Sequence, residues 1–456
     1  MKVALLFPRR HYPTGDPPLG LLYLAARLRQ RTGIAPKILD TTFRRDAFAF
    51  LRRELSAEEY DLVGISAMVT MARDANTAAA LAKQIRPETK VILGGPHPTM
   101  MAERALHDSA VDAVCLGEGE DALAEVVLRG GFAEVPGIWY REGDELRRNP
   151  ARPWLKDLDQ LPFPAFDLLN LEPYLQGWFQ MDTVRPGLRG TSVLATRGCP
   201  FQCTYCQPTL ERLFGRGLRQ HSPARVVSEL QELQGRYRLN AFLFADDTFI
   251  ADRAWVKSFC LELQGRGLNL IWGCNVRADL ADRELLAEMR DAGLRKIYVG
   301  IEAHSDRIRQ EVFRKKISRE QVEQVTRDAR SLKLSVQGYF MLGAPGETPA
   351  EVRETVGWAR RLPIDDATFN ITTPLPGTYL FDKFQARVAV APEDMDYYRR
   401  YAFAEGGGLS QAWLSRQKLR AYFGFYLQPG RLRHLLRLVF GSGGWPRLMM
   451  KLRRVL

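Results

Sequence analysis

A chain of 456 residues is longer than one hydrophobic core supports, so we expect two or more domains. Apolar residues make up 46% of it, as in ordinary globular proteins, and no apolar run reaches the roughly 18 residues that span a membrane. No secretory signal precedes Met1-Lys2-Val3, which predicts a cytoplasmic protein. Six cysteines are too sparse in this length to form a disulfide framework.

The net charge of +12 belongs to the end of the chain. Glu405 is the last acidic residue, and ten Lys and Arg residues follow it. Taking those ten charges from +12 leaves +2 for the first 405 residues. A nearly neutral body does not provide the basic surface that nucleic acids need, so we expect no nucleic-acid partner.

Residues 1–133 alternate short apolar runs with amphipathic helical patterns, such as those over 19–31 and 72–86. This alternation predicts a doubly wound, Rossmann-like parallel sheet, whose ligands lie beyond the carboxyl ends of the strands. The expected strands are Lys2–Phe7, Pro36–Asp40, Leu62–Ser66, Lys90–Leu93 and Ala113–Leu116.

The loops that follow these strands are rich in glycine and polar residues. Glycine allows a backbone to approach a ligand closely and to turn tightly into the next helix. A tight turn between strand and helix explains any one loop about as well, so the pattern carries weight only as a set. The candidate ligand-binding residues are Leu19, Gly20, Ser66, Thr70, Gly94, Gly95, His97, Gly117, Glu118 and Gly119.

Residues 134–186 are irregular and contain seven prolines. We interpret them as an interdomain linker, which we expect to be packed because it also carries several aromatic residues. A small hairpin is predicted over 135–147 and an extended connector over 158–164.

Three cysteines follow a short apolar strand predicted over Ser192–Thr196. Cys199, Cys203 and Cys206 have the spacing C-x3-C-x2-C. Three thiolates this close can hold three irons of a [4Fe–4S] cluster and leave the fourth iron open to a small molecule. A closed zinc site would need a fourth ligand, and the other three cysteines are isolated, so we expect them to be small buried apolar residues.

This motif resembles that of the radical S-adenosylmethionine (SAM) superfamily, in which the amino and carboxylate groups of SAM chelate the open iron. The resemblance implies a partial (β/α)6 barrel over residues 187–382, with its active residues at the carboxyl ends of the strands. Six expected strands fit this fold: Ser192–Thr196, Ala241–Ala245, Leu268–Cys274, Lys296–Glu302, Ser335–Leu342 and Ala367–Thr372.

The loops of the first domain resemble the cobalamin-binding domain of a large radical SAM subgroup. The matching runs are PPLGLLYLAA, GGPHPT and VCLGEGE. Many such domains ligate cobalt through the histidine of Asp-x-His-x-x-Gly, and none of the six histidines here has that context. We therefore expect base-off cobalamin without a histidine ligand, and a structural or supporting role for His97. A vestigial domain that has lost its cofactor is the alternative.

The resemblance also implies how the barrel holds SAM. Tyr205 would present its backbone and ring to the adenine, while Asp246 and Asp247 would hold the methionyl ammonium, although one of them is expected to cap a turn instead. Arg277 would pair with the SAM carboxylate or with these aspartates, and a barrel salt bridge is equally consistent. Glu302 would lie at the ribose or amine, because a buried carboxylate needs a partner.

The last two barrel strands end in loops that resemble the adenine site of the superfamily. Phe340 and Gly343 belong to the adenine-contacting strand and the turn after it, and Pro374 belongs to the loop that closes over the adenine. Gly346 and Gly377 are equally consistent with plain turns.

The resemblance implies the chemistry as well. An electron from the reduced cluster cleaves SAM to a 5′-deoxyadenosyl radical, which takes hydrogen from an unactivated carbon. Methylcobalamin then delivers a methyl group, and a second SAM remethylates the cofactor. We expect a C-methyltransferase that acts on a small or lipid-like molecule and takes electrons from flavodoxin or ferredoxin. The alternatives are an oxidative cyclase or ring-rearranging enzyme without net methylation, and a cofactor-binding sensor.

Residues 383–456 are predicted to be helical and basic. Leu432, Leu435, Leu436 and Val439 have the spacing of one apolar helix face, with arginines around them. Basic amphipathic helices with an aromatic anchor often lie on anionic membranes, so the tail predicts peripheral contact with the inner face of the membrane. A helix packed on the barrel with a solvated basic face is equally consistent.

Overall fold

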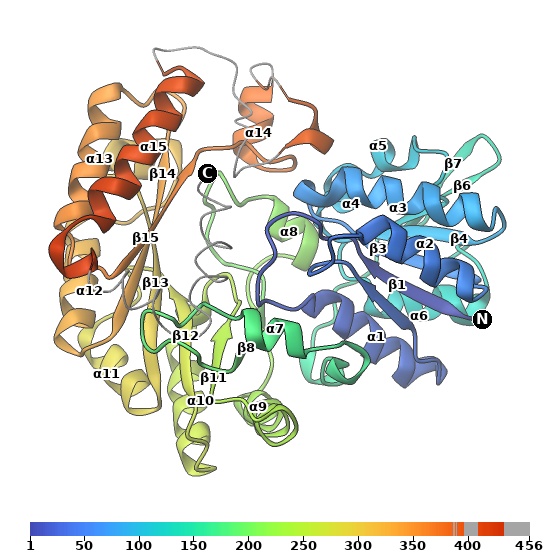
Figure 1. Ribbon diagram of the computed structural model, residues 1–456, viewed down its shortest axis with the longest axis horizontal. Helices are drawn as coiled ribbons and strands as arrows, with labels where there is room; N and C mark the ends of the chain where they lie inside the picture. The colour runs from blue at the N-terminus through green and yellow to red at the C-terminus, as the bar shows by residue number, and fades with distance from the viewer. Residues whose placement is uncertain (386–387, 389, 396–408, 433–456) are drawn as a thin grey trace.

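The computed structural model describes residues 1–385, 388, 390–395 and 409–432. Two sheets dominate it, a seven-stranded sheet in the N-terminal part and a six-stranded half-barrel in the central part (Figure 1). A long helix from the C-terminal part packs beside the half-barrel. The predicted fold class, a Rossmann-like domain followed by a partial barrel and a helical segment, is confirmed.

The first sheet has the order β2-β1-β3-β4-β5-β6-β7. Its first five strands are parallel and lie between two layers of apolar core, as expected for a doubly wound sheet. These strands are β1 (Val3–Phe7), β2 (Lys37–Asp40), β3 (Leu62–Ser66), β4 (Lys90–Gly94) and β5 (Ala113–Cys115). The helical segments around them are α1 (Leu19–Thr32), α2 (Ala47–Ala57), the 3-10 turn η1 (Val69–Met71), α3 (Ala72–Ile85), α4 (Pro96–Met100), α5 (Ala102–Leu106) and α6 (Glu120–Arg129).

The hairpin predicted in the linker forms, and it belongs to the first sheet. Its strands are β6 (Ile138–Glu142) and β7 (Glu145–Arg148), and β6 pairs antiparallel with β5. The buried Ile138 lies opposite Cys115 and extends the apolar core across this edge, so the irregular stretch begins only after the hairpin. The connector predicted as extended starts instead with a 3-10 turn, η2 (Leu158–Gln160).

The half-barrel has the order β15-β14-β13-β12-β11-β8, with all strands parallel. Along β14 every second residue is buried, which places those side chains against the outer helices and the others inside the half-barrel. The strands are β8 (Gly190–Val193), β11 (Ala241–Phe244), β12 (Ile271–Val276), β13 (Leu294–Glu302), β14 (Ser335–Leu342) and β15 (Asp366–Ile371). The outer helices are α9 (Pro223–Tyr237), α10 (Arg253–Gly265), α11 (Arg283–Asp291), α12 (Arg319–Ser331) and α13 (Pro349–Arg361).

A short antiparallel ribbon stands apart from both sheets. It consists of β9 (Thr196–Arg197) and β10 (Arg219–Gln220), and the segment between them carries the three motif cysteines and α8 (Thr209–Phe214). The sequence predicted one strand over 192–196, but the chain leaves the half-barrel after β8. The reason is that the buried carboxylate of Asp246 accepts the backbone N–H groups of Ala195 and Thr196.

Helix α15 (Gln411–Tyr426) covers the open edge of the half-barrel beside β15 (Figure 1). The hydroxyl of Tyr422 accepts the N–H of Phe369 at 3.1 Å, and the hydroxyl of Tyr426 accepts the N–H of Ala367 at 3.3 Å. These bonds satisfy backbone groups that an uncovered edge strand leaves free. Shorter elements link the larger ones: η3 (Phe166–Leu168), α7 (Glu172–Gly177), η4 (Phe249–Ala251), the π-helical turn η5 (Ile308–Val312), α14 (Tyr379–Phe384) and η7 (Pro392–Asp394).

Most of the predicted basic tail, residues 433–456, lies outside the described residues. Arg431 is described, and its guanidinium donates to the carbonyls of Leu362 and Ile364 and lies 3.7 Å from the centre of the Phe425 ring. This cation is therefore packed on the barrel. Among the described residues, no helix combines the length and apolar character needed to span a bilayer.

Candidate active site

The three motif cysteines lie on the loop between β9 and α8. Cys203 is buried, while Cys199 and Cys206 are half-buried. Burial raises the pKa of the Cys203 thiol, and burial followed by repulsion from Cys203 raises that of Cys206. Thiolates crowded in this way fit ligands of a cationic iron–sulfur cluster, which would neutralise them.

The sulfurs are not arranged around one ion. In the part of the chain that the structure describes, no group of three or more His, Cys, Asp or Glu side chains could hold a single metal ion. A cluster does not need such convergence, because each thiolate binds a different iron. The backbone supports the loop instead: Gly198 has φ +90°, and a Cβ there would collide with the carbonyl of Gly217.

The two carboxylates after β11 have different surroundings. Asp246 is 1% exposed and binds the backbone N–H groups of Ala195 and Thr196, so it holds the approach to the cysteine loop. Burial raises its pKa to about 7. The side chain of Asp247 is exposed, but protein surrounds it on several sides, and this desolvation raises its pKa to about 6. Asp247 is the carboxylate of this pair that a ligand can reach.

Arg277 forms the barrel salt bridge and does not pair with the two aspartates. It donates to both oxygens of Asp279 at 3.0 Å, and its guanidinium lies 3.6 Å from the centre of the Phe201 ring. One of its nitrogens is 3.8 Å from the sulfur of Cys203. This buried cation therefore lies beside the cysteine loop and favours its thiolates.

Glu302 has a partner within the protein. Lys315, which the sequence analysis did not single out, donates to its Oε1 at 2.8 Å, and the hydroxyl of Tyr205 donates to the same oxygen at 3.0 Å. Gly300 provides the space for the Lys315 side chain, since a Cβ at this position would collide with the lysine. The burial of Glu302 therefore does not by itself require a ligand, and its place at the ribose or amine of SAM stays a prediction. Tyr205 in turn packs edge-on against Phe313.

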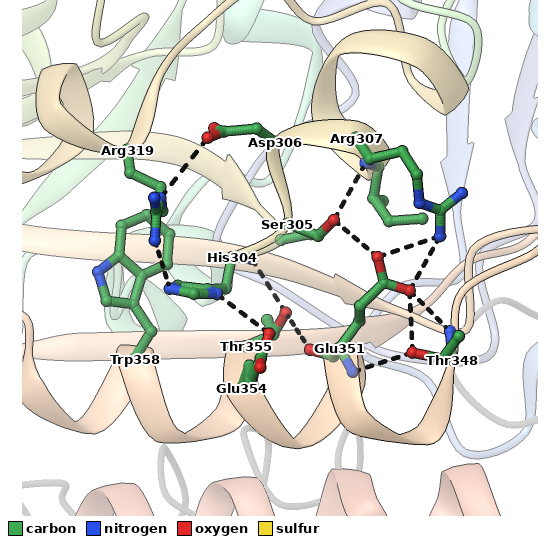
Figure 2. A network of polar contacts seen from close by, with 12 residues as sticks. His304, Ser305, Asp306, Arg307, Arg319, Thr348, Glu351, Glu354, Thr355 and Trp358 are labelled. Atoms are coloured by element: carbon green, nitrogen blue, oxygen red, sulfur yellow. Dashed lines mark hydrogen bonds and ion pairs between the residues drawn. The ribbon is translucent and has the colours of Figure 1, made fainter.

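The loop after Glu302 is fixed to α13 by a polar network (Figure 2). Glu302 has φ +67°, an uncommon conformation for a residue with a side chain. Just beyond it, the N–H of His304 donates to Thr355 at 3.0 Å, and Ser305 donates to Glu351 at 2.8 Å, as Figure 2 shows. These bonds hold the strained strand end in place.

The adenine side of the predicted site is formed by backbone. The ring of Phe340 is buried in the core, stacked on Phe369 with 5.1 Å between centroids, so only the backbone of this residue is left for the predicted contact with the adenine. Gly343 has φ +80°, and its N–H donates to the carboxylate of Glu347 at 2.6 Å. Pro374 is buried in the loop after β15.

Glu347 is a second residue that the sequence analysis did not select. Its Oε2 also accepts the N–H of Ala344 at 2.9 Å, while its Oε1 is buried without a hydrogen-bond partner. Burial raises its pKa to about 7. The sequence did offer a signal for this residue. A Glu directly after Pro345-Gly346 can accept hydrogen bonds from the backbone N–H groups at the start of the same turn.

The loops after β3 and β4 bring glycines and small polar residues to the carboxyl edge of the first sheet. Gly95 has φ +98°, and a Cβ there would be 3.1 Å from the carbonyl of Ala67. Gly20 is exposed at the start of α1 with open space around it. Ser66, Thr70 and Gly94 are half-buried at the carboxyl ends of β3 and β4. This glycine-lined edge presents backbone and small side chains, which fits a large flat ligand.

His97 lies just inside this edge. It is 5% exposed, and its backbone N–H donates to Ala67 at 3.0 Å. Its Nδ1 is buried without a hydrogen-bond partner, and burial lowers the pKa of the ring. The neutral ring therefore keeps one polar atom unsatisfied beside the loop. Leu19 is buried at the start of α1, where it packs in the barrel-side core.

The third loop belongs to the joint between the domains. Gly117 has φ +71° and donates its N–H to Thr99 at 3.1 Å. Gly119 precedes α6, where it approaches Cys115. Glu118, predicted as a cobalamin contact, pairs instead with Arg197 at 2.7 Å and with Arg219 at 2.8 Å. Its charge is satisfied by the ribbon that leads into the cysteine loop.

Comparison with known proteins identifies the family of the N-terminal domain and that of the half-barrel. The B12 binding domain family matches residues 13–127, and the radical SAM superfamily matches residues 193–359. Fold and site together define an enzyme class that combines a corrinoid with radical SAM chemistry. An uncharacterised methyltransferase of Pyrococcus horikoshii is 33% identical over 444 residues, which cover 94% of this chain and 93% of the relative. The chain therefore belongs to the cobalamin-binding radical SAM family.

Other relatives are more distant. The anaerobic magnesium-protoporphyrin IX monomethyl ester cyclase of Cereibacter sphaeroides is 27% identical over 86% of this chain and 64% of its own length. The solved structure of the radical SAM methyltransferase TsrM from Kitasatospora setae superposes with a TM-score of 0.76 at 17% identity, over 100% of this chain and 99% of that one. This likeness establishes the fold. The cofactors of the family are a [4Fe–4S] cluster, SAM and cobalamin.

Proposed function

We propose that the protein is a methyltransferase that transfers a methyl group to an unactivated carbon of its substrate. The observation that carries the proposal is the end-to-end match with a methyltransferase relative, over 94% of this chain, together with the contact between α8, which follows the cysteine loop, and α4, which follows Gly94 and Gly95. When bound, the cluster, SAM and cobalamin supply the electron, the radical and the methyl group.

On the barrel side, we assign Cys199, Cys203 and Cys206 to the cluster. Asp247 is exposed in the loop after β11, the next strand of the half-barrel, and we assign it to the ammonium group of SAM. The turn at Gly343, held by Glu347, presents backbone to the adenine. The hydrogen-bonded group of Lys315, Glu302 and Tyr205 would line the SAM site between the cluster and the adenine.

On the other side, we assign Gly20, Ser66, Thr70, Gly94 and Gly95 to cobalamin. Their lack of charge and of bulk supports a macrocycle lying against backbone. We propose that cobalamin binds base-off without a histidine ligand. The support is the buried position of His97, tied into its turn by the bond to Ala67.

The substrate and the electron donor extend the proposal. Radical SAM enzymes need a reductant and act on small molecules. We propose flavodoxin or ferredoxin as the donor, a cytoplasmic location, and, if the basic tail meets the inner face of the membrane, a lipid-like substrate. Unchanged liposome co-sedimentation after removal of residues 430–456 would contradict the membrane contact.

A cyclase is the second candidate, because two of the relatives are anaerobic magnesium-protoporphyrin IX monomethyl ester cyclases at 27% and 28% identity. Such an enzyme would produce 5′-deoxyadenosine and bind corrinoid without passing on a methyl group. The two candidates therefore differ in the fate of the methyl carbon of SAM.

The test uses anaerobically purified enzyme from cobalamin-fed cells. Acid extraction and mass spectrometry would first show whether corrinoid is bound. The enzyme would then receive a reductant and SAM with a CD3 methyl group, and the extracted corrinoid would be examined for CD3. Labelled methylcobalamin supports the methyltransferase. Bound corrinoid that stays unlabelled while 5′-deoxyadenosine accumulates favours the cyclase. Protein with cluster but no corrinoid would overturn cobalamin dependence.

A further inference from the structure

Four charges, two of them buried and two half-buried, meet where the two domains join. Arg197 donates to Glu118 at 2.7 Å and to Glu120 at 2.5 Å, and Arg219 donates to Glu118 at 2.8 Å. None of the four side chains is more than 15% exposed. Both glutamates follow β5 of the first domain, and both arginines belong to the ribbon that carries the cysteine loop. Two positive and two negative charges thus balance across the joint.

Packing closes the same joint. The indole of Trp154, from the connecting segment, lies between Gly117 and Gly215, where a Cβ would approach it to 2.9 and 2.7 Å. Gly117 precedes the paired glutamate and Gly215 lies in the segment after the cysteines. The guanidinium of Arg197 also lies 5.4 Å from the centre of the Tyr23 ring on α1. The loop after β5 and the cysteine segment are therefore held by shape as well as by charge.

No flexible spacer separates this joint from the cluster ligands. Only Gly198 stands between Arg197 and Cys199, and its backbone is confined by the carbonyl of Gly217. On the other side, Asp246 holds the N–H of Thr196. A shift of the loop after β5 is therefore transmitted through Arg197 to Cys199.

We propose that Arg197 is a positioning residue that couples the two cofactor sites. Corrinoid binding at the loop of residues 117–119 favours the arrangement of the cysteine loop that holds the cluster, and the loaded cluster favours corrinoid binding in return. Such a coupling is reciprocal by thermodynamic necessity. The inference rests on the proposed function and extends the cobalamin site proposed there to the loop after β5, because Gly117 donates its N–H to Thr99, whose hydroxyl in turn donates to the carbonyl of Gly95.

The test compares hydroxocobalamin binding by the cluster-loaded protein and by the cluster-free protein, using absorbance titration under anaerobic conditions. In the wild type the loaded form should bind at least about fivefold more tightly, the lower end of common coupling factors. Arg197→Lys keeps the charge but cannot reach both glutamates, so its ratio should fall below about twofold. Glu120→Gln removes one partner and should lower the ratio in the same direction.

Arg152→Lys is the matched control. Arg152 donates with two nitrogens to Glu125 of α6, at 3.1 and 2.7 Å, and that pair does not involve the ribbon. Its variant should keep the wild-type ratio. Equal affinities of the two wild-type forms, or a full ratio in both Arg197→Lys and Glu120→Gln, would overturn the coupling alone. Absence of hydroxocobalamin binding in both wild-type forms would overturn the proposed function as well.

Discussion

The two faces of the site are built by opposite means. On the barrel face, charges are buried and paired: Glu302 with Lys315, and Arg277 with Asp279. On the facing edge of the first domain, the ligand-side residues are glycines and small polar groups with few charges. Buried charge needs a fixed partner to be tolerated, whereas glycine imposes shape through the backbone alone. The barrel face is thus set for ionic groups, and the first domain for a bulky neutral one.

Loss of a motif cysteine should break the barrel face completely. Cys203→Ala removes one of the three cluster thiolates, so iron content, absorbance near 400 nm and 5′-deoxyadenosine formation should fall to background. Cys260→Ala is the control, because Cys260 lies on the buried face of α10, in the hydrophobic core. That variant should keep its iron and its absorbance. A Cys203→Ala protein with a full cluster would contradict the assignment.

Loss of Arg197 should break the joint between the faces. Arg197→Ala leaves Glu120 buried without its partner, which should lower the free energy of unfolding by about 3–5 kcal/mol. Arg147→Ala removes exposed pairs with Glu142 and Glu145 and should leave the free energy of unfolding nearly unchanged. Urea unfolding monitored by circular dichroism measures both. Equal small losses would mean that the joint carries little stability.

The buried carboxylate of Glu347 makes stability depend on pH. Its pKa is raised to about 7 in the folded protein by burial. The unfolded chain therefore releases this proton near pH 4.5 and the folded chain only near pH 7, so the wild type loses stability as pH rises through that window. Glu347→Gln removes the titration. Its stability relative to the wild type should be about 2–3 kcal/mol more favourable at pH 8 than at pH 5.

Urea unfolding at pH 5, 6.5 and 8 tests this. Asp246, which burial also shifts to about 7, titrates in both proteins and cancels in the difference. A constant difference across the three pH values would show that Glu347 ionises normally in the fold.

Substitutions at two glycines of the first domain should have the smallest effects on stability and binding. Gly95→Ala puts a methyl group 3.1 Å from the carbonyl of Ala67 at a positive φ, which should cost about 1–3 kcal/mol. Gly20→Ala has open space in α1 and should stabilise the protein by up to about 1 kcal/mol. Both should weaken hydroxocobalamin binding. Unchanged affinity in Gly20→Ala would remove Gly20 from the proposed site.

The strands and the cluster motif could be predicted because their signals are local. The alternation of apolar runs and helical patterns placed β3 and β14 with the bounds that the structure has. The spacing of Cys199, Cys203 and Cys206 indicates its chemistry without knowledge of the fold, since the three ligands are within one short loop. The hairpin before residue 148 was also visible, but its membership of the first sheet was not.

Partners far apart in the sequence were decided only by tertiary structure. Glu118 and Arg197 are 79 residues apart, and no local pattern distinguishes a carboxylate that meets a cofactor from one that meets an arginine. Lys315 escaped selection for the same reason, whereas the partners of Glu347 are the N–H groups of Gly343 and Ala344 in its own turn. The inward or outward direction of Phe340 depended on which face of β14 met the helices. Local spacing determined the motif and the elements, while burial and long-range pairing of charges decided which side chains remain open to a ligand.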